Sequence, residues 1–234
     1  MRDLSLAFIG IYLISWHNQH VLVRVLQGQR LPFLPWSGMV PSLRPARRWL
    51  WGQIAVMLLF WHFFPNLSIL AIAVLLVELL AAARADRAKG IVPDGIVLAS
   101  ILLGIAFASL GAPGLATIYI LLPSTAWTQV LAGAMALFLA SASLLWLALL
   151  FEAVTGREGL GLGDVKLAGV IGLFLGWDGA MRSLFYAAIL ALLLALLRST
   201  AGRRSLPFGR PQPFAPAMAM GTLLHCILLP HFIF

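Results

Sequence analysis

The chain has 234 residues, of which 62% are apolar and only 10% are charged. Soluble domains are about 45–50% apolar and about 25% charged, and even a large soluble domain leaves about a quarter of its chain surface in water. This composition excludes a soluble enzyme. The single cysteine, Cys226, excludes a disulfide scaffold and a four-cysteine zinc site. The chain is therefore interpreted as a polytopic membrane protein.

Apolar runs divide the whole chain. A helix that crosses the hydrocarbon core needs about 20 residues, with a usual range of about 17–25. The candidate spans are residues 4–22, 49–64, 67–83, 95–110, 130–151, 167–177, 183–197 and 214–229. The pattern predicts an all-α integral membrane protein with about eight transmembrane helices. The run 167–177 is short enough to be re-entrant instead.

The distribution of Lys and Arg distinguishes between a run 167–177 that crosses the membrane and one that is re-entrant. If every run crosses the membrane, all Lys and Arg residues except Arg2 and Arg182 lie on one side. If 167–177 were re-entrant, the basic loop 198–210 would be exported, against the positive-inside rule. The full set of crossings is therefore favoured, with both termini outside the cytoplasm. The net charge of +8 then marks cytoplasmic loops rather than a nucleic-acid-binding surface.

The predicted domain organisation has two parts. Residues 1–48 form an N-terminal anchor helix and a cytoplasmic loop, and residues 49–234 form the membrane-embedded core. The first apolar run is interpreted as an anchor because no small-residue cleavage site follows it, as a secretory signal would require.

Two acidic residues stand at the boundaries of apolar runs. Asp86 follows the run 67–83, and Asp164 precedes the run 167–177. Two crossings separate them, so the chain returns Asp164 to the membrane face where Asp86 lies. Two carboxylates at one depth can share a proton, because like charges at close range do not both ionise easily. One can then activate a water as general base while the other protonates the scissile carbonyl oxygen or the leaving amine.

Local explanations compete with this chemistry. Three glycines, Gly159, Gly161 and Gly163, precede Asp164. They permit a positive φ or a close backbone approach, as an extended substrate would need. A glycine-rich turn before a helix-capping aspartate is also common in proteins without this activity. Asp86, with Arg84 and Arg87 nearby, could equally be an ion-paired loop residue.

Two motifs resemble those of a known family. The run Thr155-Gly-Arg-Glu-Gly-Leu-Gly-Leu-Gly-Asp164-Val-Lys-Leu167 resembles the GxGD signature of type IV prepilin peptidases. The run Asp86-Arg-Ala-Lys-Gly-Ile-Val-Pro-Asp94 resembles the family's other aspartate motif, and Leu206-Pro-Phe-Gly209 with Pro213-Phe-Ala-Pro216 resembles its Pro-Phe-Gly-Pro-Phe stretch. In order and spacing, the resemblance covers residues from about Arg47 to the C-terminus.

The resemblance implies a function for the chain. It implies an aspartic endopeptidase of the bacterial inner membrane, with Asp86 and Asp164 as the catalytic pair and Gly161, Gly163 and Lys166 in support. The implied substrate is a prepilin or pseudopilin of a pilus or a type II secretion system. The cut follows a glycine at the cytoplasmic face, before the apolar helix. No metal or cofactor is needed, since a carboxylate activates the water.

The sequence lacks the cysteine pairs that accompany a second activity, N-methylation, in longer members of this family. Longer relatives also methylate the new N-terminus and carry two Cys-x-x-Cys pairs in a cytoplasmic loop. The corresponding loop here, residues 28–48, contains no cysteine, so we expect peptidase activity alone. Two alternatives remain: a catalytically degenerate pilin-binding assembly factor, and a small-solute transporter with the aspartates as ion sites.

Two further charged residues lie next to the motifs. Asp94 follows Pro93 and precedes an apolar run, a position typical of a helix N-cap. Lys166 could keep the Asp164 carboxylate ionised, contact the substrate, or extend to the membrane interface.

Overall fold

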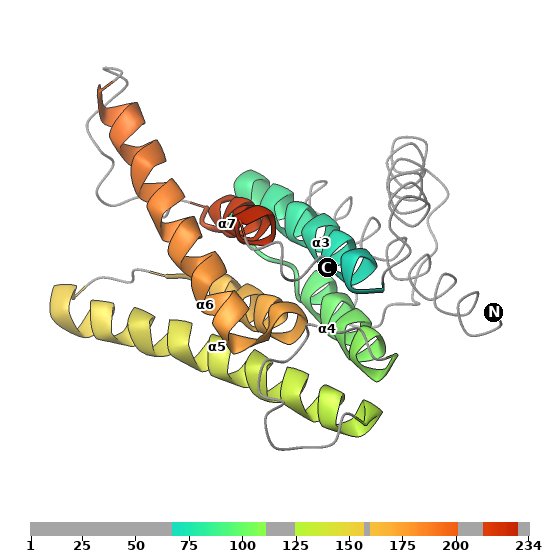
Figure 1. The fold of residues 1–234 in the computed structure, drawn as a ribbon. Coiled ribbons are helices and arrows are strands. Elements are labelled where there is room, and N and C mark those ends of the chain that lie inside the picture. Colours follow the sequence, from blue (N-terminus) through green and yellow to red (C-terminus); the bar gives the residue numbers. More distant parts are fainter. Residues whose placement is uncertain (1–66, 111–124, 157–159, 201–212, 229–234) are drawn as a thin grey trace, which may run out of the picture.

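The computed structural model describes residues 67–110, 125–156, 160–200 and 213–228. This part of the chain is helical (Figure 1): α3 (Leu67–Lys89), α4 (Asp94–Ser109), α5 (Ala126–Thr155), α6 (Leu162–Thr200) and α7 (Ala215–Leu228). The all-α class is therefore confirmed for these residues. The predicted spans 4–22 and 49–64, and the predicted domain boundary after residue 48, lie outside them.

The apolar runs of the described residues all coincide with helices. Three helices are long and apolar enough to cross a membrane, namely Leu67–Lys89, Ala126–Thr155 and Leu162–Leu197. The apolar helices Asp94–Ser109 and Ala215–Leu228 are shorter. These lengths and compositions are those of a membrane protein.

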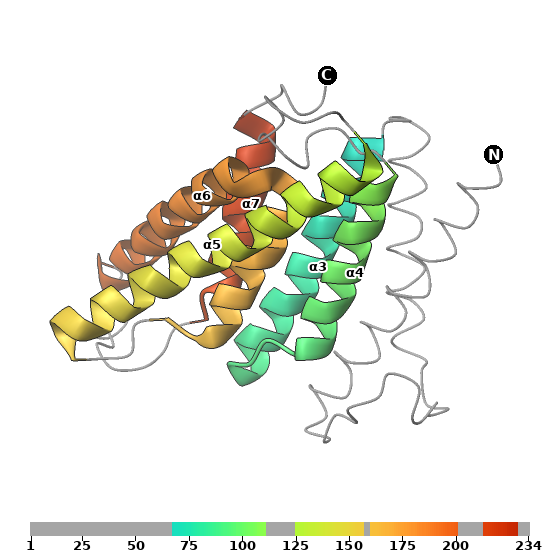
Figure 2. The ribbon, with the colours of Figure 1, turned by 90° about the horizontal axis from the view of Figure 1, so that it is seen from below.

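Helix α6 contains both of the runs predicted at 167–177 and 183–197. The helix is interrupted at Gly176, where φ is 73° and ψ is 171°, so it has two halves that run in different directions (Figures 1 and 2). The predicted connection after residue 177 is itself helical, and Asp178 and Arg182 form an ion pair of 2.7 Å across one of its turns. The reversal is therefore made at one glycine instead of in a polar loop.

Substitution of Gly176 by alanine is expected to destabilise the protein by about 1–3 kcal/mol, because its backbone conformation is essentially restricted to glycine. The free energy of unfolding in detergent micelles measures this effect. Gly161→Ala is the matched control, because the nearest atom to an added Cβ there is 3.8 Å away. An unchanged free energy for Gly176→Ala would contradict the strained conformation.

Successive helices run in alternating directions, so that several helix ends meet (Figure 2). One end of the bundle carries the end of α3, the start of α4, the end of α5, and the starts of α6 and α7. We call it the charged end, because Arg84, Arg87, Lys89 and Lys166 all lie there. The ion pair of Asp178 and Arg182 lies towards the opposite end, after the break in α6.

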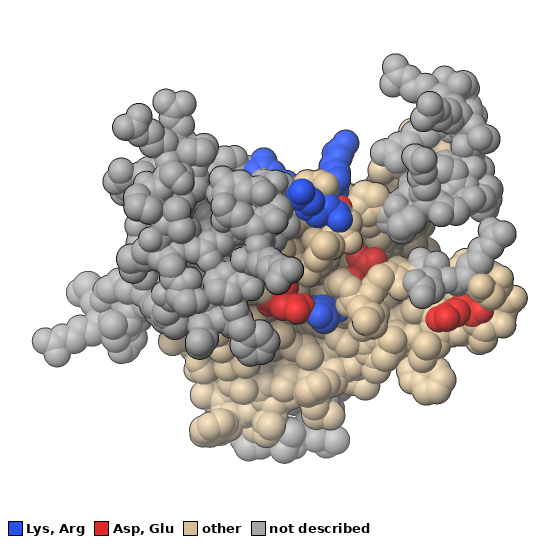
Figure 3. Space-filling view, turned by 180° about the vertical axis from the view of Figure 1, so that it is seen from behind, with Lys and Arg blue, Asp and Glu red and all other residues tan. Residues whose placement is uncertain are grey.

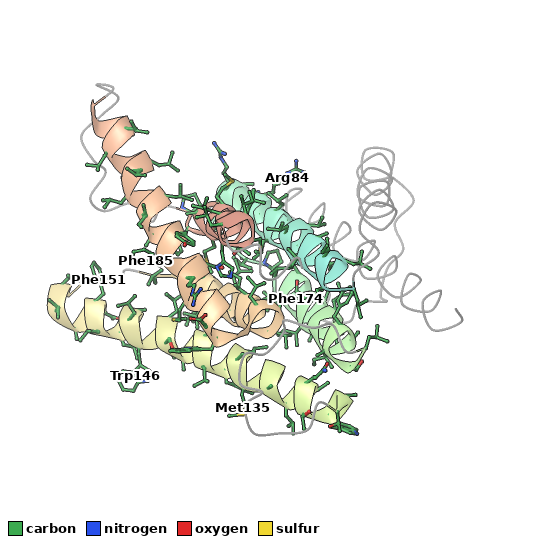
Figure 4. All side chains as sticks on the ribbon, in the orientation of Figure 1. Arg84, Met135, Trp146, Phe151, Phe174 and Phe185 are labelled. Atoms are coloured by element: carbon green, nitrogen blue, oxygen red, sulfur yellow. The ribbon has the colours of Figure 1, made fainter. Side chains whose placement is uncertain are left out.

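Small residues let α5 and α6 approach closely. A Cβ added to Gly172 would lie 2.5 Å from the Ala136 carbonyl oxygen, and Ser141 Oγ donates a hydrogen bond of 3.2 Å to the Val165 carbonyl. Such contacts are typical of helix packing in membranes. The other face of α5 is exposed and apolar, and Met135 and Trp146 point away from the bundle (Figure 4). This face has the character of a lipid-facing surface.

Candidate active site

Asp86 lies in the last turns of α3 and is buried, with 9% of its surface exposed. Helix α3 continues past the apolar run through an alanine-rich stretch, and alanine is the strongest helix former. Asp86 is therefore held in a helix rather than in a loop. Its Oδ2 accepts a hydrogen bond of 3.1 Å from the backbone N–H of Ala215, at the start of α7.

Asp164 is the third residue of α6 and is half-buried. Its backbone N–H donates a hydrogen bond of 3.0 Å to the Gly161 carbonyl, and the Gly161 backbone hydrogen-bonds its carboxylate. The carboxylates of Asp86 and Asp164 lie close enough to interact electrostatically. Both acids thus lie at the charged end, as the topology predicts, and their pairing for catalysis stays a prediction.

Gly163 joins the two motifs. A Cβ added there would lie 2.9 Å from Val92 Cγ2, in the short connection between α3 and α4. Among the described glycines only Gly90, Gly156 and Gly176 have a positive φ, so Gly161 and Gly163 do not adopt the left-handed conformation that glycine permits. At Gly163 the close neighbour is the other motif of this chain, and the approach of an extended substrate stays a prediction.

The predicted N-cap at Asp94 is wrong. Asp94 is already the first residue of α4, the cap position belongs to Pro93, and no side-chain hydrogen bond caps this helix. The Asp94 carboxylate instead forms an ion pair with Lys166 of α6. This contact crosses between the starts of two helices, which local propensity does not reveal. Lys166 therefore pairs with Asp94, the last residue of the first motif, and not with Asp164, which is two residues before it in sequence.

The ion pair between Lys166 and Asp94 is expected to contribute less than about 1 kcal/mol, because both side chains are well exposed, at 47% and 81%. In a double-mutant cycle, Lys166→Met and Asp94→Asn should each lower the unfolding free energy slightly, and the double variant should lose no more than the larger single loss. Strictly additive losses would show that the two groups do not interact. Detergent unfolding of the four proteins supplies these values.

The charged end is seen from outside in Figure 3, which views the molecule from behind Figure 1. Basic and acidic atoms of several helices gather on this face, and acidic atoms near its middle lie in a hollow. No group of three His, Cys, Asp or Glu in the described part of the chain lies close enough to hold a metal ion.

The backbone N–H of Ala215 was not predicted as part of the site. The stretch Pro213-Phe-Ala-Pro216 resembles a family motif, but the resemblance predicted no role for it. The adjoining prolines were the available signal, because proline is common in the first turn of a helix and the start of a helix presents unpaired N–H groups.

Comparisons with known proteins agree with these motifs. The family model of the type IV leader peptidases matches residues 73–196. Three similar proteins are each named prepilin leader peptidase/N-methyltransferase. The one from Burkholderia pseudomallei (strain 1026b) is 31% identical over 165 residues, 68% of this chain and 46% of its own. Those from Pseudomonas putida and Dichelobacter nodosus are 30% and 33% identical over 166 residues, 70% of this chain and 51% and 50% of theirs.

The chain spans about half the length of these curated relatives. No solved structure gives a significant match. The family match covers more than half of the chain and includes both aspartate motifs, at residues 86–94 and 155–167. The chain belongs to the type IV leader peptidase family.

Proposed function

We propose that the protein is a membrane aspartic endopeptidase that removes the leader peptide from type IV prepilins or pseudopilins. The observation that carries the proposal is that Asp86 and Asp164 come from separate helices and lie within electrostatic range at one end of the bundle. Family membership supports the reaction class. The position of both acids at helix ends, rather than in the middle of a span, favours a peptidase over a transporter.

In the proposed mechanism the two carboxyl groups share one proton. The ionised member takes a proton from water, and the resulting nucleophile attacks the scissile carbonyl. The protonated member donates its proton to the carbonyl oxygen. As the tetrahedral intermediate collapses, the proton taken from water goes to the leaving amine, and a hydroxyl of the intermediate returns a proton to the two carboxylates. Gly163 lets the start of α6 lie close to Val92, and the Gly161 carbonyl accepts a hydrogen bond from the Asp164 N–H. Lys166 ties the start of α6 to α4. This hydrolysis requires no metal or cofactor.

The proposed location follows from the charges. The last turns of α3 carry Arg84, Arg87 and Lys89, and the start of α6 carries Lys166. These helix ends meet at the end of the bundle where the two acids lie (Figure 2). Because cytoplasmic loops carry the excess of Lys and Arg, we place this end at the cytoplasmic face of the bacterial inner membrane. The substrate is then a short cytoplasmic leader followed by an apolar helix in the bilayer, cut after a glycine at their junction.

We propose peptidase activity without N-methylation. The relatives' names include both activities, but the loop 28–48 of this chain contains no cysteine. We therefore expect the mass of the cleaved pilin to stay the same when S-adenosylmethionine is added, because no methyl group is transferred to it. A methylated product would overturn this part of the proposal.

The test of the main proposal is a cleavage assay with the full chain in liposomes and a prepilin from the same genome. We expect mass spectrometry to find the free leader and a mature pilin, with the cut after a glycine before the apolar segment. A pilin that binds but stays intact would identify the protein as an assembly factor. Neither binding nor cleavage, with solute flux across the liposome membrane, would favour a transporter.

A further inference from the structure

The start of α7 reaches into the candidate site. Ala215 is the first residue of this helix, so its backbone N–H has no carbonyl partner within the helix. It donates instead to Oδ2 of Asp86, at 3.1 Å. Ala215 is fully buried and Asp86 nearly so. A carboxylate from a residue far away in the sequence thus does what an N-cap side chain usually does.

This hydrogen bond favours a fixed, ionised carboxylate. A hydrogen bond from N–H to a charged acceptor is about twice as strong as a neutral one, and the start of a helix adds a positive partial charge. The next residue, Pro216, has no N–H to offer. The first turn of α7 is otherwise regular, because the Met218 N–H donates to the Phe214 carbonyl at 3.1 Å.

Helix α7 is itself fixed in position by α6. A Cβ added to Gly221 would lie 2.5 Å from the Ala187 backbone nitrogen, in the second half of α6. The first half of the same helix carries Asp164. The donor that holds Asp86 therefore belongs to a helix packed directly on the one that carries the other acid.

We propose that the backbone N–H of Ala215 is a positioning group, which holds the Asp86 carboxylate in place at the end of the bundle where Asp164 lies. The catalytic arrangement then needs three helices, α3, α6 and α7. This inference rests on the proposed peptidase function and adds to it a group that has no side-chain chemistry.

The sharpest test replaces the amide of Ala215 by an ester, introduced as the α-hydroxy acid by nonsense suppression. The ester removes the N–H and keeps the methyl side chain. The matched control is the same replacement at Met218, which removes an ordinary helical hydrogen bond in the same turn. Ala215→Pro, which also lacks the N–H at a position that tolerates proline, provides a second variant.

For the ester at Ala215 we expect kcat for prepilin cleavage to fall about ten- to hundredfold, as for the loss of one hydrogen bond to a charged group. KM should change less than about threefold, because this N–H is used by Asp86 and not by the substrate. The acid limb of the pH profile should move to higher pH, since the lost donor favoured the charged carboxylate. The Met218 ester should retain kcat.

Equal kcat in the Ala215 ester and wild-type proteins, or equal losses in both esters, would overturn the positioning role. A second readout does not depend on activity: the Ala215 amide proton resonance should shift with pH and lose that shift in Asp86→Asn. An Ala215 amide proton resonance with the same pH dependence in the wild-type and Asp86→Asn proteins would also overturn the inference. Should the wild-type protein fail to cleave any prepilin, the proposed function fails, and the resonance still decides whether Ala215 holds Asp86.

Discussion

Replacement of either Asp86 or Asp164 by asparagine is expected to reduce prepilin cleavage by about a hundred- to ten-thousandfold. An amide is close in shape to a carboxyl group but neither accepts a proton from water nor donates an acid proton, and general acid–base catalysis accounts for rate factors of this size. The double variant should be about as slow as the single ones. Two groups that act together in catalysis are already ineffective when one of them is removed, so removal of the second costs little more. Single-turnover cleavage of a prepilin in liposomes measures all three.

The control for this prediction is Asp178→Asn. Asp178 lies past the break in α6, half-exposed and paired with Arg182, so its loss should leave the cleavage rate within about twofold of wild type. Membrane expression and unfolding free energy should be unchanged in every variant. If an Asp86→Asn or Asp164→Asn protein that is folded cleaves at the wild-type rate, the acid–base mechanism is wrong.

The positions of the helices were predictable from the sequence because hydrocarbon selects apolar runs of nearly fixed length. The residues at which the helices end were less predictable. Helix α3 extends to Lys89, beyond the apolar run, because alanine favours the helix through the polar boundary. The break at Gly176 was missed because α6 contains several glycines, and composition does not tell which of them takes a positive φ. That depends on where the second half of α6 must pack.

The candidate site was predictable only in part. The number of crossings between Asp86 and Asp164 places both at one end, and this parity is readable from hydropathy alone. The contact of Lys166 with Asp94 and that of Ala215 with Asp86 join residues far apart in sequence. Asp94 was predicted as a helix N-cap because that prediction used only the residues that flank it in sequence. Packing between helices decides which partner a polar group finds.

Gly161 and Gly163, the two glycines of the GxGD signature, are expected to differ in their sensitivity to alanine. At Gly163 an added Cβ would lie 2.9 Å and 3.0 Å from the Val92 side chain, whereas at Gly161 the nearest atom is 3.8 Å away. Gly163→Ala must therefore move the start of α6 away from the connection that follows Asp86. A misplacement of about 1 Å can cost a hundredfold in rate, so we expect a loss of about ten- to hundredfold in kcat/KM. Gly161→Ala should stay within about threefold of wild type.

A compensating substitution separates displacement of the helix from other effects of Gly163→Ala. Val92→Ala removes the methyl group nearest to the added Cβ, so the double variant should regain part of the lost activity. The rates of the four proteins, measured with one prepilin, give the coupling between the two positions. Independent effects of the two substitutions would show that contact between the motifs does not set the position of Asp164. Recovery in the double variant would mean that the glycine before the aspartate is required because the first motif leaves no room for a side chain.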